Sequence, residues 1–285
     1  MYQWPDVSQM DIVDFILNIA AVLLWANWRA LRFDPIVKRR PATLVGALKP
    51  ITPLQSRHWQ LPAAIVALIF FRAIFYWQIG KGFGWSGKLD LSVIALSFRS
   101  DSFLRIFLFS ILSFGVLLAI FYLWLLLFSI LKGPEPFQRV VRIQLGFVDG
   151  WARATKLLLP FFAVAILWWP ASWLFGWLDI FPEPISAAHR IEEAVVIGLG
   201  SYLLWKFLII ALLILYLLNS YIYFGKHPFW NYVEVTAQKL LQPLKMIPLR
   251  IGKVDFAPIV GIVLYFFLAQ LFGLLLAKLY ARLPL

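Results

Sequence analysis

The sequence contains no cysteine, and few of its residues are charged. The absence of cysteine excludes disulfide bonds, thiolate metal sites, iron–sulfur clusters and thiol nucleophiles. Charged residues make up 14% of the chain and hydrophobic residues 62%. Soluble domains have about 25% charged and roughly 45–50% apolar residues. The mean hydropathy of +0.82 points the same way. The composition therefore predicts an integral membrane protein.

Sequence patterns that carry catalysis are missing too. The chain has no nucleophile elbow, no P-loop, no glycine-rich dinucleotide turn and no H-E-x-x-H zinc motif. The stretch G-F-G-W-S-G (82–87) is glycine-rich, but it follows a predicted membrane helix and does not predict a phosphate loop. Of the three histidines, His58 and His227 occupy corresponding basic connections and could together hold a haem. No other ligand pattern accompanies them, so we expect no enzyme activity, no metal and no cofactor, with haem at His58 or His227 as the alternative.

Long apolar runs are what the sequence has in place of such motifs. A bilayer core of about 30 Å needs about 20 mostly apolar residues per helix. Six windows meet this requirement: 12–31, 61–79, 103–131, 157–178, 194–223 and 256–281. Nothing between them resembles a soluble domain. The predicted fold is an all-α polytopic membrane bundle of six transmembrane helices, in a single membrane domain, 1–285.

The basic residues are distributed unequally between the two sides of this predicted bundle. The connections 32–60 (with Arg29), 132–156 and 224–255 hold 17 Lys and Arg, against 7 in the other connections and the termini. The positive-inside rule places the three basic connections in the cytoplasm and both termini outside it. The net charge of +12 is therefore an orientation signal, and we expect no nucleic-acid partner. The predicted location is a multi-pass protein of the cell inner membrane or a thylakoid-like membrane.

Spans two, four and six each start, in this interpretation, at a proline: Pro62, Pro160 and Pro258, at equal spacings of 98 residues. Paired aromatic residues follow each proline at the same offset: Phe70 and Phe71, Trp168 and Trp169, Phe266 and Phe267. This match predicts an internal triplication, with repeats at about 12–80, 103–178 and 194–285. Proline suits the first turn of a helix because its missing N–H would have no partner there. Asp255, before Pro258, could also cap the last span.

Each cytoplasmic connection has an early proline, namely Pro35, Pro134 and Pro228, and then an amphipathic segment. Apolar stripes flanked by cations suit helices lying on an anionic leaflet. The alternative is that the same segments pack beneath the bundle. The basic residues Lys239, Lys245, Arg250 and Lys253 form the predicted lipid- or partner-facing surface. The expected partners are anionic lipids at the cytoplasmic face and other integral membrane proteins.

The third repeat contains the stretch G-K-V-D-F-A-P (252–258), and the first basic connection contains D-P-I-V (34–37). These stretches resemble the G-x-x-D-F-[SA]-P and N-P-I-V motifs of the YggT family of membrane proteins, and the third repeat carries most of the resemblance. The stretch from Gln242 to Pro248 resembles the family's P-x-R-R-x-x-P. The chain departs from the family at Thr236, which Ala and Gln follow instead of Glu and Pro, and in having three units where bacterial members have two. The motif residues are Asp34, Pro35, Pro62, Pro134, Pro160, Pro228, Pro243, Lys245, Pro248, Gly252, Asp255 and Pro258.

The resemblance implies a non-enzymatic role: assembling, stabilising or organising other membrane complexes or lipids, with family links to cell division, osmotic tolerance and cytochrome biogenesis. Two cations near the middle of predicted spans, Arg72 and Lys206, leave a second function open. Charges are costly in hydrocarbon, so we expect Arg72 to pair with Asp14 and Lys206 to snorkel. If they instead line a polar path, the chain is a small-solute or ion transporter or channel.

Overall fold

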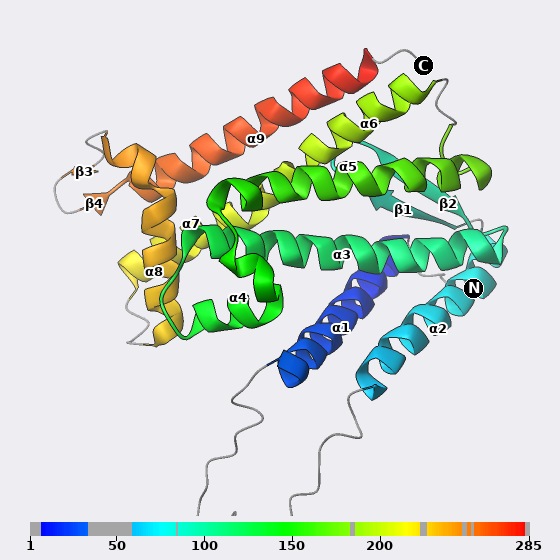
Figure 1. The fold of residues 1–285 in the computed structure, drawn as a ribbon, viewed down its shortest axis with the longest axis horizontal. Helices are drawn as coiled ribbons and strands as arrows, with labels where there is room; N and C mark the ends of the chain where they lie inside the picture. Colours follow the sequence, from blue (N-terminus) through cyan, green and yellow to red (C-terminus); the bar gives the residue numbers. More distant parts are fainter. Residues whose placement is uncertain are drawn as a thin grey trace, which may run out of the picture. The chain divides into compact units, whose positions relative to one another are not determined.

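The structure is a computed structural model and is built almost entirely of helices (Figure 1). It describes residues 7–33, 59–83, 85–182, 186–222, 227–246, 250–251 and 254–282. Six helical stretches in this part of the chain are long and apolar enough to cross a membrane. They are Ile12–Arg32, Gln60–Gly82, Phe103–Leu131, Arg153–Trp177, Ala187–Tyr221 and Ala257–Ala281. The predicted all-α polytopic fold is confirmed.

The long helices alternate with short elements. In chain order the α-helices are α1 (Val7–Phe33), α2 (Gln60–Phe83), α3 (Phe103–Leu131), α4 (Phe137–Leu145), α5 (Arg153–Trp177), α6 (Ala187–Gly200), α7 (Trp205–Tyr221), α8 (Pro228–Leu240) and α9 (Ala257–Ala281). The 3₁₀ turns are η2 (Gly146–Gly150), η3 (Ser201–Leu204) and η4 (Gln242–Met246). Two small antiparallel hairpins, which the sequence did not predict, are β1 (Ser86–Asp90) with β2 (Ala95–Arg99), and β3 (Arg250–Ile251) with β4 (Val254–Asp255).

The chain forms two compact units. Unit 1 comprises 1–87 and 97–121, and unit 2 comprises 88–96 and 122–285. In unit 1, α1 and α2 run side by side (Figure 1), and Ala21, Ile65 and Phe114 form a buried contact among α1, α2 and α3. The boundary falls inside α3 and inside the first hairpin, so neither unit coincides with one of the predicted repeats.

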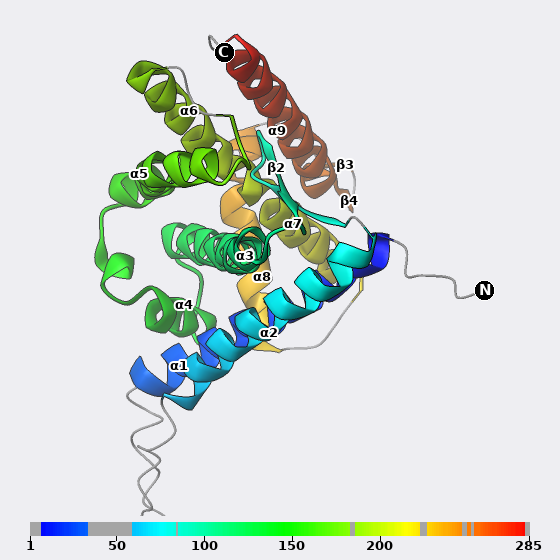
Figure 2. The ribbon, with the colours of Figure 1, turned by 90° about the vertical axis from the view of Figure 1, so that its right-hand side faces the viewer.

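Unit 2 holds the larger core. In this unit α5 lies against α6 (Figure 2), and α7 packs on both α8 and α9. The core around α7 is aliphatic: Leu213 is fully buried and belongs to one buried cluster with Val233 and Ala237 of α8. Helix α8 is therefore docked on the membrane helices through its apolar face. Of the two interpretations of this amphipathic segment, packing beneath the bundle is the one that the structure shows.

The short helix α4 is less completely covered. Its Val141 and Leu145 are buried, whereas Val140 is 53% exposed. Phe147, in the 3₁₀ turn that follows, is 78% exposed, and the centre of its ring lies 5.7 Å from that of Trp151, with the two rings tilted by 57°. This segment keeps an exposed apolar and aromatic edge of the kind that suits a leaflet surface. The two amphipathic connections in the described part of the chain thus differ in how much of their apolar face remains free.

The three prolines that were predicted to start spans do not have equivalent positions. Pro62 lies in the first turn of α2, and Pro258 is in the first turn of α9 after the N-cap residue Phe256. Pro160, however, lies inside α5, which starts earlier, at Arg153. The prediction was wrong for Pro160 because a membrane helix can contain a proline if neighbouring groups satisfy the freed carbonyls. The Tyr202 hydroxyl donates to the carbonyl oxygen of Leu157, at 2.5 Å, in the same turn; the carbonyl that Pro160 itself leaves without an N–H donor is that of Lys156, four residues before it.

The fifth span also differs from its prediction of 194–223. It starts at Ala187, where the Ser186 hydroxyl caps the backbone N–H of His189, and it is interrupted at η3. The polar residues between 189 and 193 moved the predicted start inward, because a hydropathy window penalises them whether or not they are buried. Sequence reasoning could not foresee that His189 and Glu193 would be buried and paired with each other.

Some predicted residues lie outside the part of the chain that the structure describes. These are Asp34, Pro35, His58, Pro248, Gly252 and Lys253. The backbones of Lys245, Arg250 and Asp255 are described, within η4, β3 and β4, but their side chains are not. The capping role of Asp255 therefore stays a prediction. Arg250 and Asp255 are paired in register across the β3–β4 hairpin.

Candidate functional site

A buried polar cluster in unit 1 is centred on Arg72. This residue lies near the middle of α2, about 18 Å along the helix from Gln60 at 1.5 Å per residue. Arg72 is only 3% exposed. Neither end of the helix is within easy reach of its side chain, so snorkelling cannot relieve its burial. Its charge has to be satisfied by neighbouring helices.

The neighbouring helices supply those partners. The Arg72 guanidinium donates to Asp14 Oδ1 at 3.1 Å and to Asn18 Oδ1 at 2.5 Å, both on α1. It also donates to the Ser110 hydroxyl of α3 at 2.8 Å and to the Ser110 carbonyl oxygen. The planar fork of arginine therefore binds acceptors on two helices at once. The ion pair predicted between Arg72 and Asp14 is present.

The Asp14 carboxylate is held by further donors. Its Oδ2 accepts from Asn18 Nδ2 at 2.9 Å and from the Ser113 hydroxyl at 2.6 Å, and its Oδ1 accepts from the Tyr76 hydroxyl at 3.4 Å. Ser113 also accepts from Asn18 Nδ2, and Ser110 donates to the Ile69 carbonyl oxygen. These bonds link α1, α2 and α3 into one network. The groups satisfy one another, as buried polar clusters must if they are not to destabilise the fold.

Sequence reasoning found Asp14 and Arg72 but missed four members of this cluster: Asn18, Tyr76, Ser110 and Ser113. A signal for them is present in the spacing of polar residues within apolar spans. Asn18 follows Asp14 by four residues and Tyr76 follows Arg72 by four, while Ser113 follows Ser110 by three. Residues three or four apart share one face of a helix. Polar residues with that spacing in three separate spans predict three polar faces that could meet.

A second buried cation, Lys156 of α5, lies in unit 2 and is 1% exposed. Its ammonium donates to the Ser129 hydroxyl of α3 at 2.8 Å and to the Asp149 carbonyl oxygen at 2.6 Å. The Asp149 carboxylate is 4.0 Å away and accepts from Ser129. Lys156 lies in the first turn of α5, close to the helix end. From the sequence, Lys156 was only one of the charges in the basic connection 132–156. In the structure it joins α3, η2 and α5.

A third cluster, also in unit 2, pairs His189 with Glu193 on successive turns of α6. His189 Nε2 is 3.2 Å from Glu193 Oε1, and Trp168 Nε1 of α5 donates to Glu193 Oε2 at 3.4 Å. His189 is 6% exposed and Glu193 2%. Their spacing of four residues places them on one helix face. The cluster joins α5 to α6.

Lys206 differs from the other cations in the spans. It is the second residue of α7, directly after the η3 interruption, and its ammonium lies 4.9 Å from the centre of the Phe207 ring. An ammonium over an aromatic face is stabilised by the ring quadrupole. Lys206 is partly buried in unit 2, whereas Asp14 and Arg72 belong to unit 1.

The predicted lipid- or partner-facing residue Lys239 is exposed, but its ammonium already has partners. It donates to the carbonyl oxygens of Leu131 and Lys132, at 2.8 and 2.6 Å, at the C-terminal end of α3. A cation there complements the helix dipole. Next to it, the ring of Tyr232 lies against Gly133, where a Cβ atom would be 2.1 Å from the ring. Burial raises the pKa of the Tyr232 phenol, and its interaction with Thr236 offsets only part of the rise.

The described part of the chain offers no grouping of three His, Cys, Asp or Glu side chains that could hold a metal ion. His227 caps α8, its Nδ1 accepting from the backbone N–H of Phe229 at 3.2 Å. It therefore has a local structural role, and His58 lies outside the described residues. The absence of a cofactor stays a prediction.

Comparisons of the chain with protein-family models, with curated proteins and with solved structures find no match. The resemblance to the YggT family rests on the sequence motifs alone, and its implications stay predictions.

Proposed function

We propose that the chain is a non-enzymatic membrane protein that assembles or stabilises other membrane complexes by lateral packing. The observation that carries the proposal is a stripe of exposed side chains on α5: Phe162, Ile166, Trp169, Trp173 and Trp177. Their spacing of three or four residues places them on one face. Trp173 and Trp177 are 66% and 67% exposed, whereas Trp168, next to Trp169 in the sequence, is 4% exposed. Whether a tryptophan of α5 is exposed therefore depends on the face of the helix that it occupies.

The contrast with the polar clusters supports the same proposal. The Arg72, Lys156 and His189 clusters use their hydrogen bonds to join helices of this chain to one another. They provide rigid packing, and the apolar outer faces remain available for lipids or partner helices. In a bilayer, helices associate chiefly by shape and van der Waals packing, because lipid tails are as apolar as leucine. Large rigid tryptophan side chains bring extensive contact area to such an interface.

The occupant that we propose for the α5 stripe is a transmembrane helix of another integral membrane protein. The test is purification of the full chain from its native membrane in a mild detergent, followed by mass spectrometry and stoichiometry of what accompanies it. A membrane protein in fixed stoichiometry is expected. The double variant Trp173→Leu with Trp177→Leu should lose that partner while its own melting behaviour stays the same.

The matched control is Phe266→Leu with Phe267→Leu, which changes two exposed aromatic side chains on α9. It should retain the partner. Equal retention by both double variants, or a homogeneous chain with no partner, would overturn the proposal that α5 is an assembly surface.

A second candidate function is transport of a small solute or ion, and one observation favours it. The fifth span changes from α-helix to a 3₁₀ turn at η3, with buried Ser201 in that turn and Lys206 just after it. A 3₁₀ stretch inside a long helix often marks a functional hinge. Solute flux in proteoliposomes that is lost in Lys206→Met, but kept in Lys278→Met near the end of α9, would favour this function. Absence of flux for every solute class would favour assembly.

The basic-residue distribution also underlies the proposed location. We place the connections 132–156 and 224–255 in the cytoplasm and both termini outside it, in an inner or thylakoid-like membrane. Labelling of single cysteines, introduced at Lys88 and at Glu234 in this cysteine-free chain, tests the orientation. A membrane-impermeant thiol reagent added to intact cells should label position 88 and not position 234.

A further inference from the structure

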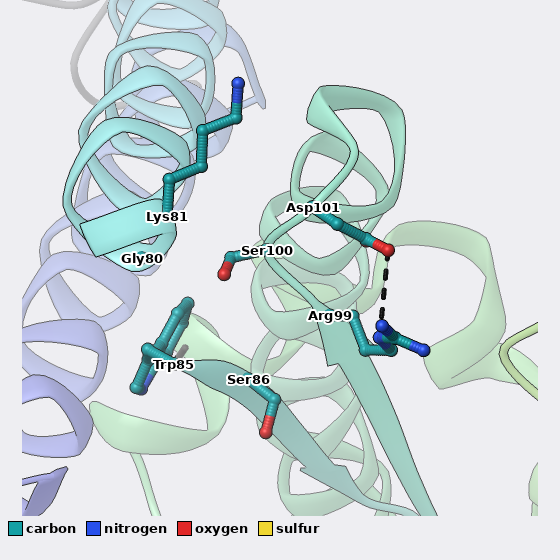
Figure 3. A pocket seen from close by; sticks show the side chains of 7 residues that line it. All are labelled: Gly80, Lys81, Trp85, Ser86, Arg99, Ser100 and Asp101. Carbon is teal, nitrogen blue, oxygen red and sulfur yellow. Dashed lines mark ion pairs between the residues drawn. The ribbon is translucent and has the colours of Figure 1, made fainter. Parts of the chain in front are cut away.

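A hollow in unit 1 lies where the second span ends and the third begins. It has a volume of about 490 Å³ and is lined by the end of α2, the first hairpin and the turn before α3 (Figure 3). The span Gln60–Gly82 stops at its edge, and Phe103 starts the next span. The hollow is therefore at the depth of lipid headgroups, next to the hydrocarbon core. Its volume is in the range of small-ligand sites.

The walls of the hollow are firmly built. Trp85 is 8% exposed, and its ring lies 5.0 Å from that of Tyr76 and 5.8 Å from that of Phe109. Gly80 approaches Ser100 so closely that a Cβ atom would be 2.6 Å from the Ser100 Cβ. Ser100 is buried, and Figure 3 shows its hydroxyl between the end of α2 and Trp85. A buried aromatic wall and a close backbone approach keep the hollow from collapsing.

The charged side chains around the hollow are mainly cationic. Lys81 and Arg99 line it from opposite sides, with Asp101 as the acid (Figure 3). Asp101 Oδ2 lies 3.7 Å from Arg99 Nε and 3.3 Å from Arg105 Nη1, so two guanidinium groups already share this carboxylate. Two lining cations against one carboxylate leave positive charge uncompensated. An anionic group is the complementary ligand.

The Arg99–Asp101 pair does not prevent such binding. The side chains of Arg99 and Asp101 are 74% and 49% exposed. Exposed ion pairs of this kind contribute only about 0–1 kcal/mol, so an incoming anion can replace the carboxylate at Arg99. The Lys81 ammonium lies 3.9 Å from the centre of the Trp77 ring, one turn earlier on α2, and has to leave this aromatic contact to bind an anion in the hollow. Arginine and lysine are the usual partners of phosphate oxygens.

We infer that this hollow binds a phosphate group, with Lys81 and Arg99 as its cationic ligands and the Ser86 and Ser100 hydroxyls as further donors. Of the glycine-rich stretch 82–87, Trp85 and Ser86 line the hollow, whereas its charges come from the ends of α2 and β2. Phosphate at this depth can belong to a phospholipid headgroup or to a soluble phosphate. The inference goes beyond the proposed assembly function, because it concerns the purified chain without any protein partner.

The experiment measures binding to the full chain in detergent by native mass spectrometry. The probes are phosphatidylglycerol, diacylglycerol with the same acyl chains, and inorganic phosphate. Phosphatidylglycerol is expected to bind, diacylglycerol much less. Lys81→Gln with Arg99→Gln should weaken the phosphatidylglycerol complex by about tenfold or more, as expected for loss of two charge-assisted contacts. Lys88→Gln, an exposed lysine of β1 outside the hollow, is the matched control and should bind normally.

The three probes distinguish a phospholipid headgroup from soluble phosphate as the ligand of the hollow. Displacement of the lipid by inorganic phosphate, or binding of inorganic phosphate alone, would assign the site to soluble phosphate. If the double variant does not fold, the single variant Arg99→Gln, which changes an exposed side chain, replaces it in the binding measurement. Lys81→Arg with Arg99→Lys should preserve binding. Unchanged phosphatidylglycerol binding in the Gln variants, or no preference over diacylglycerol together with no phosphate binding, overturns the inference and leaves partner purification unaffected.

Discussion

Arg72 in unit 1 and Lys156 in unit 2 are both nearly fully buried, yet the structure satisfies them differently. Arg72 lies in the middle of its span and binds a carboxylate, an amide oxygen, a hydroxyl and a carbonyl from two other helices. Lys156 lies in the first turn of its helix and binds one hydroxyl and one carbonyl, with the Asp149 carboxylate at 4.0 Å. We attribute the difference in the number of partners to the position of each cation along its helix.

The difference follows from the two side chains and from their solvent. A guanidinium keeps its charge and has five donors in a rigid fork, so at mid-span it requires several fixed acceptors. An ammonium has three donors, and close to a helix end water can complete its coordination when a protein partner is lost. Breaking the first arrangement should therefore cost far more than breaking the second.

The largest expected effect is that of Arg72→Leu. It leaves the Asp14 carboxylate without its cation within the span, and removal of one partner of a buried ion pair costs about 3–5 kcal/mol. The measurement is the free energy of unfolding in mixed micelles, followed by tryptophan fluorescence. Arg72→Leu combined with Asp14→Leu should recover most of the loss. A single variant as stable as the parent would mean that the network does not hold unit 1 together.

Lys156→Met should have the intermediate effect. It removes the donor to Ser129 and to the Asp149 carbonyl oxygen, for a cost of about 2 kcal/mol. The loss is smaller than at Arg72 because water reaches the freed groups near the end of α5. The same unfolding assay measures it, with Arg153→Met, an exposed cation one turn earlier, as the control. If Lys156→Met lost as much free energy of unfolding as Arg72→Leu, the position of the cation along its helix would not explain the difference between the two sites.

Two serine variants, one in each cluster, test the same comparison and should have a smaller effect on the free energy of unfolding. Ser113 links Asn18 to Asp14 in the first cluster, and Ser129 links Lys156 to Asp149 in the second. Interhelical hydrogen bonds in membrane proteins contribute about 0.6 kcal/mol on average and about 1.7 at most. We expect Ser113→Ala near the upper value and Ser129→Ala near the average. A reversed order in the unfolding assay would contradict the assumption that water substitutes at the second site.

How much of this could be predicted from the sequence depends on the kind of residue. The six spans are predictable because hydropathy depends on composition and length, and the Asp14–Arg72 pair because an uncompensated charge in a span demands a partner. Ser110 and Ser113 escaped notice because serine is common in membrane helices and its role appears only when three helices meet.

The position of Pro160 escaped prediction for another reason. The equal spacing of three prolines treated them as equivalent helix starts, but α5 starts seven residues before Pro160, at Arg153, where the chain leaves the extended conformation of Ala152. The small hairpins and the break at η3 are decided by packing and not by propensity.

The smallest expected effect concerns a third cation, Lys239, which is exposed and lies at a helix end. Its ammonium binds the last carbonyls of α3, so Lys239→Gln should cost about 0.3–1 kcal/mol by loss of the interaction with the helix dipole. The loss should shrink at high salt, because exposed charges are screened. Lys239→Arg should keep most of the stability. The assay is the free energy of unfolding at low and at high salt, in micelles with and without anionic lipid. A loss of stability that appears only with anionic lipid would show that Lys239 interacts with the membrane surface and not with α3. Only Arg72 and Lys156 would then remain as cations that stabilise the chain's own helices.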